Sequence, residues 1–167
     1  QAGQELSSFE NVSGHFEYRL LKADIVTLSE VQTEDIKMKY DAFHASNEKE
    51  LITAENIFYE SGKSDIKDES KPTLNHVAKI LKDYPGVTVE IISHTDAVGN
   101  DKANLALSKK RAQAVCDYLI KNGADPKRIK VQGKGETQVR NRCFNDVDCS
   151  DKEHEYNRRT EFKFVKP

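Results

Sequence analysis

The chain has 167 residues, and its 26 lysine and arginine residues nearly balance 28 aspartate and glutamate residues, for a formal net charge of −2. This balance argues against nucleic acid as a partner, because gripping a phosphate backbone takes a clear surplus of cations on one face. With 37% hydrophobic and 32% charged residues, the composition is typical of one globular domain with a charged surface. No apolar run approaches the ~20 residues that span a bilayer. We therefore expect a soluble segment, with any membrane association made by parts of the protein outside it.

The first fifty residues differ in pattern from the rest. They contain short β-prone pieces, one of them with clear apolar–polar alternation, at residues 14–20, 25–28 and 36–40. A polar stretch without periodicity lies at residues 45–50. We therefore expect residues 1–50 to form a β-rich segment, or the end of a preceding module, plus a linker. The main domain is expected over residues 51–167.

Strands and helices alternate regularly in the main domain. Apolar residues at helical spacing predict one helix from about Leu74 to Leu81, ended by Pro85-Gly86, and a second from about Lys102 to Asn122, ended by Gly123. Strands are expected at residues 56–59, 87–92, 129–132 and 160–165. The order βαβαβ with a final strand predicts an α/β (α+β) fold, in which helices pack on a mixed sheet.

Residues 94–112 carry the most informative polar side chains. Asp96 comes after the strand at residues 87–92, and strand ends are where ligands commonly lie in such folds. In the next helix, Asn104, Ser108 and Arg111 lie along one flank of the apolar face. That apolar face is expected to consist of Leu105, Ala112, Val115, Cys116 and Leu119. A carboxylate holds an ammonium, and a guanidinium grips a carboxylate by two parallel hydrogen bonds. The pattern therefore predicts a site for the zwitterionic end of an amino acid.

Each of these residues also has a structural interpretation. Asp96 would satisfy N–H groups of a turn, and Arg111 would pair with a structural carboxylate or extend its stem over apolar surface. Asn157-Arg158-Arg159, before the last strand, either brings a second guanidinium to the same rim or is solvated. His94 and Asp96 lack a third ligand at helical or hairpin spacing, so we expect no metal, and we expect no cofactor.

The three cysteines are too few for a disulfide scaffold and are not spaced for zinc. Cys143 and Cys149 lie in a polar loop and either close a small ring, which would imply export, or stay reduced. Cys116, on the apolar face of a helix, is expected to be a buried free thiol, because free cysteine behaves as a small hydrophobe.

The motif TD-x-x-G-x-x-x-x-N-x-x-LS-x-x-RA, filled from Thr95 to Ala112, together with the late NRR, resembles the OmpA-like peptidoglycan-binding domain. The resemblance covers residues 51–167. It implies non-covalent binding of the meso-diaminopimelate residue in the cell-wall stem peptide, on the periplasmic face of the outer membrane. By motif position it implies that Asp96 and Arg111 hold the ammonium and carboxylate, with Asn104 and one of Arg158 or Arg159 in support. The family's disulfide-bearing late loop is similar to residues 143–149.

Two other classes of protein compete with this interpretation. A cell-wall hydrolase would need a nucleophile with a base, a carboxylate pair or a metal, and Ser108 has no recognisable base beside it. A thiol oxidoreductase would need C-x-x-C at a helix start. We therefore expect no enzyme. An envelope protein-interaction module, docking through the β-rich segment and the acidic loop at residues 146–151, is compatible with wall binding.

Overall fold

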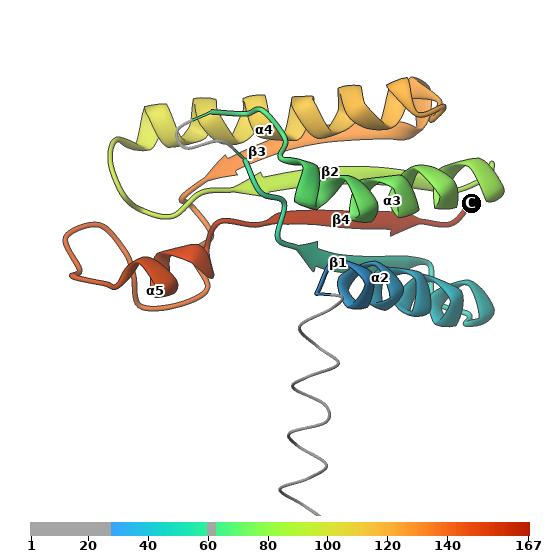
Figure 1. Ribbon diagram of the computed structural model, residues 1–167, viewed down its shortest axis with the longest axis horizontal. Coiled ribbons are helices and arrows are strands. Elements are labelled where there is room, and N and C mark those ends of the chain that lie inside the picture. The colour runs from blue at the N-terminus through green and yellow to red at the C-terminus, as the bar shows by residue number, and fades with distance from the viewer. Residues whose placement is uncertain (1–27, 60–62) are drawn as a thin grey trace, which may run out of the picture.

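The computed structural model describes residues 28–59 and 63–167. They form two layers, with a four-stranded sheet on one side and three long helices on the other (Figure 1). The helices are α2 (Leu28–Ala45), α3 (Lys71–Asp83) and α4 (Asp101–Lys121). None of the helices in the described ranges is long and apolar enough to cross a membrane. The β-prone pieces expected at residues 14–20 and 25–28 lie outside the described residues, except for Leu28, which is the first residue of α2.

The sheet has the order β1-β4-β2-β3. Its strands are β1 (Glu50–Glu55), β2 (Thr88–His94), β3 (Ile129–Gly135) and β4 (Thr160–Val165). β4 runs antiparallel to both β1 and β2, whereas β2 and β3 are parallel and joined through α4. Alternate residues such as Ile91 and Phe162 point under the helices and form the core, while the other face carries half-buried and exposed side chains. The predicted mixed sheet with helices packed on it is confirmed.

The strand predicted at residues 56–59 is wrong, because the strand that joins the sheet is β1, immediately before it. β1 pairs with β4 in a register that places Leu51 beside Phe164. Beyond Glu55 the chain leaves the sheet, although Ile57 is still buried in the core. Tyr59 makes only an isolated bridge to Ile66. Residues 56–59 therefore contact the core without pairing as a strand of the sheet. In so short a run, apolar periodicity does not distinguish a paired strand from an unpaired buried segment.

The β-prone interpretation of residues 36–40 is also wrong, because they lie in α2. Ile36, Tyr40 and Phe43 recur at i, i+4 and i+7, and all three are buried in the core that α3 and the sheet share. Lys166 fixes the end of this helix by donating from Nζ to the carbonyls of Phe43 and Ser46. Tertiary packing of one helical face thus outweighs the β propensity of the individual residues.

Helix α4 lies unusually close to β3. A Cβ atom at Gly133 would lie 2.6 Å from Ser108 Oγ and would collide with the backbone of Lys109, so only glycine fits there. Ser108 Oγ donates to the carbonyl of Leu105 and accepts from the backbone N–H of Gly135. Because helix backbone rests on strand backbone here, the expected burial of Leu105 is wrong, and the residue is 38% exposed.

The two ends of α4 are set by local sequence. The side chain of Asn100 accepts hydrogen bonds from the backbone N–H groups of Lys102 and Ala103, which caps the N-terminus. At the other end Gly123 has φ of 97°, the left-handed conformation that stops a helix. The cap lies four residues after Asp96, so the same loop that starts the helix also carries the candidate site.

Candidate functional site

A hollow of about 760 Å³ lies where β2 ends, beside the first half of α4 and the short helix α5 (Asp151–Glu155). Asp96, Asn104, Arg111 and Arg158 all contribute to its lining. The structure therefore brings together four of the six residues predicted to bind a ligand. They come from three separate stretches of chain, the loop after β2, helix α4 and the turn before β4.

Asp96 is a buried carboxylate, 9% exposed, at the base of the loop after β2. Its Oδ1 accepts from the backbone N–H of Val98 at 3.2 Å, which is the turn role that its position suggested. Its Oδ2 accepts from Arg158 at 2.8 Å. Asp96 is thus held in place by the turn and presents a negative charge to the hollow.

Arg111 supplies the positive pole. Its guanidinium carbon lies 4.7 Å from the centroid of the Tyr59 ring, and its Nε donates to the carbonyl of Lys63 at 3.2 Å. No carboxylate of the described residues lies within ion-pair distance of it, which disagrees with the interpretation that it pairs with a structural carboxylate. Burial lowers the pKa of Arg111, while Tyr59 and Asp96 oppose that effect. A half-buried guanidinium whose terminal nitrogens have no partner among the described residues is suited to an incoming carboxylate.

The two consecutive arginines, Arg158 and Arg159, have different surroundings in the structure. Arg158 faces the hollow, where it reaches Asp96 and Asp151. Arg159 is 6% exposed and donates to Glu161 and to the carbonyls of Asn157 and Gln138, so all three of its nitrogens are engaged inside the protein. Consecutive residues alternate in direction where a strand begins, which accounts for the difference.

Asn104 and Ser108 have different surroundings. The amide of Asn104 donates to the carbonyl of Val98 at 3.0 Å and to Glu136 at 2.6 Å, so it ties the loop after β2 to α4. Ser108 is fully buried against β3 and does not line the hollow. The predicted placement of Ser108 in the site is therefore corrected, since the close approach of α4 to β3 turns its hydroxyl toward the sheet.

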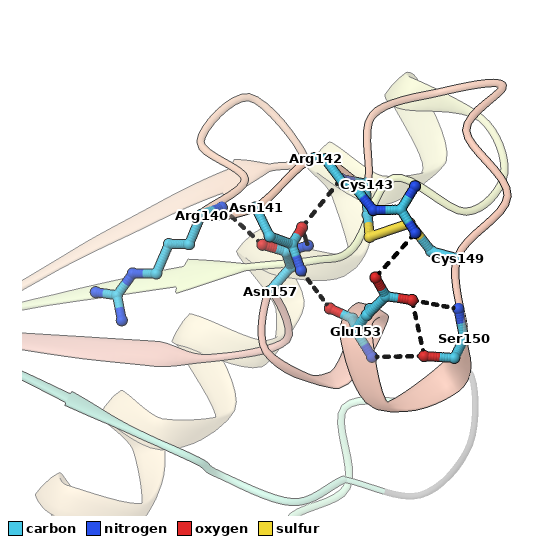
Figure 2. Close-up of a disulfide and its surroundings, with 8 residues drawn as sticks. All are labelled: Arg140, Asn141, Arg142, Cys143, Cys149, Ser150, Glu153 and Asn157. Carbon is cyan, nitrogen blue, oxygen red and sulfur yellow. Dashed lines mark hydrogen bonds and ion pairs between the residues drawn. A yellow bond between two sulfur atoms is a disulfide. The ribbon is translucent and has the colours of Figure 1, made fainter.

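The late loop is closed by a disulfide between Cys143 and Cys149, and Cys116 is a buried free thiol. The bridge was one of two alternatives left open by the residues, and the structure decides for it. Figure 2 shows the bridge beside the start of α5, where Ser150 and Glu153 exchange hydrogen bonds as a capping box and Arg142 pairs with Glu153 at 3.1 Å. The disulfide and the cap thus fix the first turn of α5 against the hollow.

Some lining residues were not predicted from the sequence. Tyr59, Asp151 and His154 also line the hollow, although Asp151 was expected only in an acidic loop that docks another protein and the other two carried no binding signal. Thr95 also lines it, and its buried hydroxyl has no hydrogen-bond partner among the described residues. A smaller hollow of about 170 Å³ adjoins the first and shares Tyr59, Arg111 and Arg158 with it. The Thr95 hydroxyl is the kind of orphan polar group that a ligand satisfies.

His94 lies beneath the smaller hollow and is fully buried, 3.6 Å from Glu161. Burial lowers its pKa to about 4, and Arg159 acts in the same direction, whereas Glu161 opposes them. The ring is therefore neutral at physiological pH and contributes no charge to the site. The larger hollow takes its charge from the carboxylates of Asp96 and Asp151, the guanidiniums of Arg111 and Arg158, and the ammonium of Lys67.

Comparison with known proteins fits this geometry. A model of the OmpA family matches residues 58–151, more than half of the chain, so this chain belongs to the OmpA family. It is 35% identical to outer membrane protein A of Bordetella avium over 81 residues, which are 48% of this chain and 42% of that protein. The region shared with this chain is thus less than half of that protein's length.

Solved structures show the same fold. The periplasmic domain of Helicobacter pylori MotB superposes with a TM-score of 0.60 at 21% identity, over 72% of this chain and 79% of that one. The peptidoglycan-associated lipoprotein of Burkholderia pseudomallei superposes with a TM-score of 0.54 at 22% identity, over 70% and 90% of the two chains. These likenesses support the predicted mixed sheet and helical layer.

Proposed function

We propose that this chain binds peptidoglycan non-covalently, through the free end of meso-diaminopimelate in the stem peptide. The observation that carries the proposal is that Asp96 and Arg111 line one hollow as opposite charges, with Arg111 free of any described carboxylate. The ligand ammonium would lie at Asp96, and its carboxylate between Arg111 and Arg158. Each contact would be a charge-assisted hydrogen bond.

Membership in the OmpA family supports the proposal, as does the fold shared with a lipoprotein named for its association with peptidoglycan. The chain would act without chemistry of its own, as a tether between the cell wall and an outer-membrane or periplasmic protein. It would lie on the periplasmic face of the outer membrane, a location that suits the disulfide. Asn104 would act by holding the loop that carries Asp96, and Arg159 by shaping the turn that carries Arg158.

Co-sedimentation with purified cell-wall sacculi tests the proposal. Asp96→Asn and Arg111→Ala should each weaken binding by more than tenfold, because losing one partner of a desolvated charge pair costs roughly 2–5 kcal/mol. Lys121→Ala, which removes an exposed cation from the far end of α4, serves as the matched control and should bind as the parent does. Undiminished binding by Arg111→Ala would refute the ligand role.

The same experiment separates the competing classes of protein. An envelope protein-interaction module would be recovered with its partner whether or not sacculi are present. A hydrolase would release soluble wall fragments into the supernatant. A binding module without chemistry should do neither, and its recovery should depend on sacculi and saturate with their amount.

A further inference from the structure

Arg158 bridges two carboxylates at the hollow. One terminal nitrogen donates to Asp96 Oδ2 at 2.8 Å, and the other donates to Asp151 Oδ1 at 2.9 Å. The two carboxylates belong to different elements, because Asp96 comes after β2 and Asp151 is the first residue of α5. The guanidinium is therefore shared between the loop after β2 and the start of α5.

This sharing bears on the ligand because Asp96 is the group proposed to hold the ligand ammonium. An arginine beside a single carboxylate tends to form two parallel hydrogen bonds with it. If Arg158 did so with Asp96, it would compete with the ligand cation for the same oxygens. Asp151 engages one of the two terminal nitrogens and adds a negative charge near the hollow, and both effects favour a cation at Asp96.

We infer that Asp151 is a specificity-determining residue, which makes the hollow prefer a ligand with an ammonium beside its carboxylate over a ligand with the carboxylate alone. The inference rests on the proposed function and adds to it a residue that chooses between two ligand chemistries. Asp151 lies outside the motif from Thr95 to Ala112.

The backbone of Asp151 is well fixed, although its side chain is 89% exposed. Ser150, directly before it, caps α5 and is itself adjacent to the disulfide at Cys149. The backbone carbonyl of Asp151 also lies 3.4 Å from the guanidinium of Arg158. The carboxylate of Asp151 is therefore in place beside Arg158 before a ligand binds, but solvent screens its charge. The effect on binding should be modest and should shrink as salt is added.

Calorimetric titration with two synthetic peptides tests the inference. The first is L-alanyl-γ-D-glutamyl-meso-diaminopimelate, and the second is identical except that hydrogen replaces the ammonium at the free end of the diaminopimelate. Asp151→Asn should bind the first peptide about threefold more weakly than the parent, a change typical of exposed ion pairs. The affinity of Asp151→Asn for the second peptide should not fall, because Arg158, once released from Asp151, is free to turn toward the carboxylate of the peptide.

Asp148→Asn is the matched control, since it removes the same charge from the same loop at a residue that does not line the hollow. It should leave both affinities unchanged. Equal weakening of both peptides by Asp151→Asn would mean that Asp151 only orders α5, and the inference would fail. It would fail too if Asp151→Asn bound the first peptide as tightly as the parent, with the proposed function intact. If the parent bound neither peptide, the proposed function itself would be wrong.

Discussion

The guanidinium of Arg111 stacks on the ring of Tyr59, 4.7 Å from its centroid. The Tyr59 hydroxyl lies 3.3 Å from the hydroxyl of Thr160 on β4, and this hydrogen bond fixes the ring on the sheet. Burial raises the pKa of Tyr59. The ring therefore positions the guanidinium without neutralising it. A carboxylate in place of the ring would fix the arginine equally well but would occupy the charge that a ligand needs.

Replacing Tyr59 by leucine should weaken sacculus binding by about twofold to thirtyfold, since cation–π contacts are worth roughly 0.5–2 kcal/mol. Tyr156→Leu is the matched control, because that tyrosine is exposed and does not line the hollow. Binding is measured by co-sedimentation over a range of sacculus concentrations. If the two variants bound equally well, Tyr59 would not be positioning Arg111.

Replacing Gly133 by alanine should destabilise the fold by roughly 1–3 kcal/mol or more, because the added Cβ meets the backbone of α4 rather than a movable side chain. The control is Gly86→Ala, where the three atoms nearest to the added Cβ all belong to the ring of Pro167 and the nearest lies 3.2 Å away. Urea unfolding measures the free energy of unfolding of both variants. A Gly133 variant as stable as the parent would show that the close approach of α4 to β3 is not needed.

The pH dependence of stability should carry a contribution from His94. An ordinary histidine in the unfolded chain takes up its proton near pH 6.5, whereas folded His94 stays neutral until about pH 4. The unfolded state thus binds more protons in that window, and stability is lost as pH falls through it. Two and a half pH units correspond to a loss on the order of 3 kcal/mol.

His94→Asn should lessen this dependence, so the free energies of unfolding of parent and variant should converge as pH falls from about 6.5 toward about 4. Below that window the group contributes no further change. Denaturant titrations at several pH values measure the difference. Parallel pH profiles for the two proteins would show that His94 does not titrate as its burial requires.

Alkylation without reductant should modify a single cysteine, Cys116, and only after denaturation, because that thiol is buried and the other two are bridged. Cys143→Ser with Cys149→Ser should lower the free energy of unfolding by about 2–3 kcal/mol on the chain-entropy estimate for so short a ring. Mass spectrometry and urea unfolding provide the two measurements. Three alkylated thiols in protein from an oxidising compartment would contradict the bridge.

Much of the fold was predictable from local pattern. Helices α3 and α4 and strands β2 and β4 were expected within one or a few residues, because each has a strong period and a clear stop such as Gly123. Helix α2 was not predicted, because the apolar residues that define its helical face lie among β-prone neighbours. Their burial depends on α3 and the sheet, which no local window contains.

The site was predictable where its residues share one stretch of chain. Asp96, Asn104 and Arg111 succeed one another along a strand end and a helix, so geometry alone placed them together. The prediction for Ser108 was wrong because the glycines on β3 allow α4 to lie close to the sheet, so that the Ser108 hydroxyl contacts β3 instead of the hollow. That Arg158 lines the larger hollow, whereas Arg159 lines only the smaller one, depends on Asp151 and Glu161, which reach the two arginines only in the folded chain.

The most direct test of peptidoglycan recognition is calorimetric titration of the parent with two stem peptides, one carrying meso-diaminopimelate and the other carrying lysine at that position. Lysine keeps the ammonium but lacks the second carboxylate, which would leave Arg111 unpaired in a half-buried site. We predict at least about tenfold tighter binding of the diaminopimelate peptide. Equal affinities would contradict the proposed site, because recognition would then rest on parts of the wall that Asp96 and Arg111 do not read.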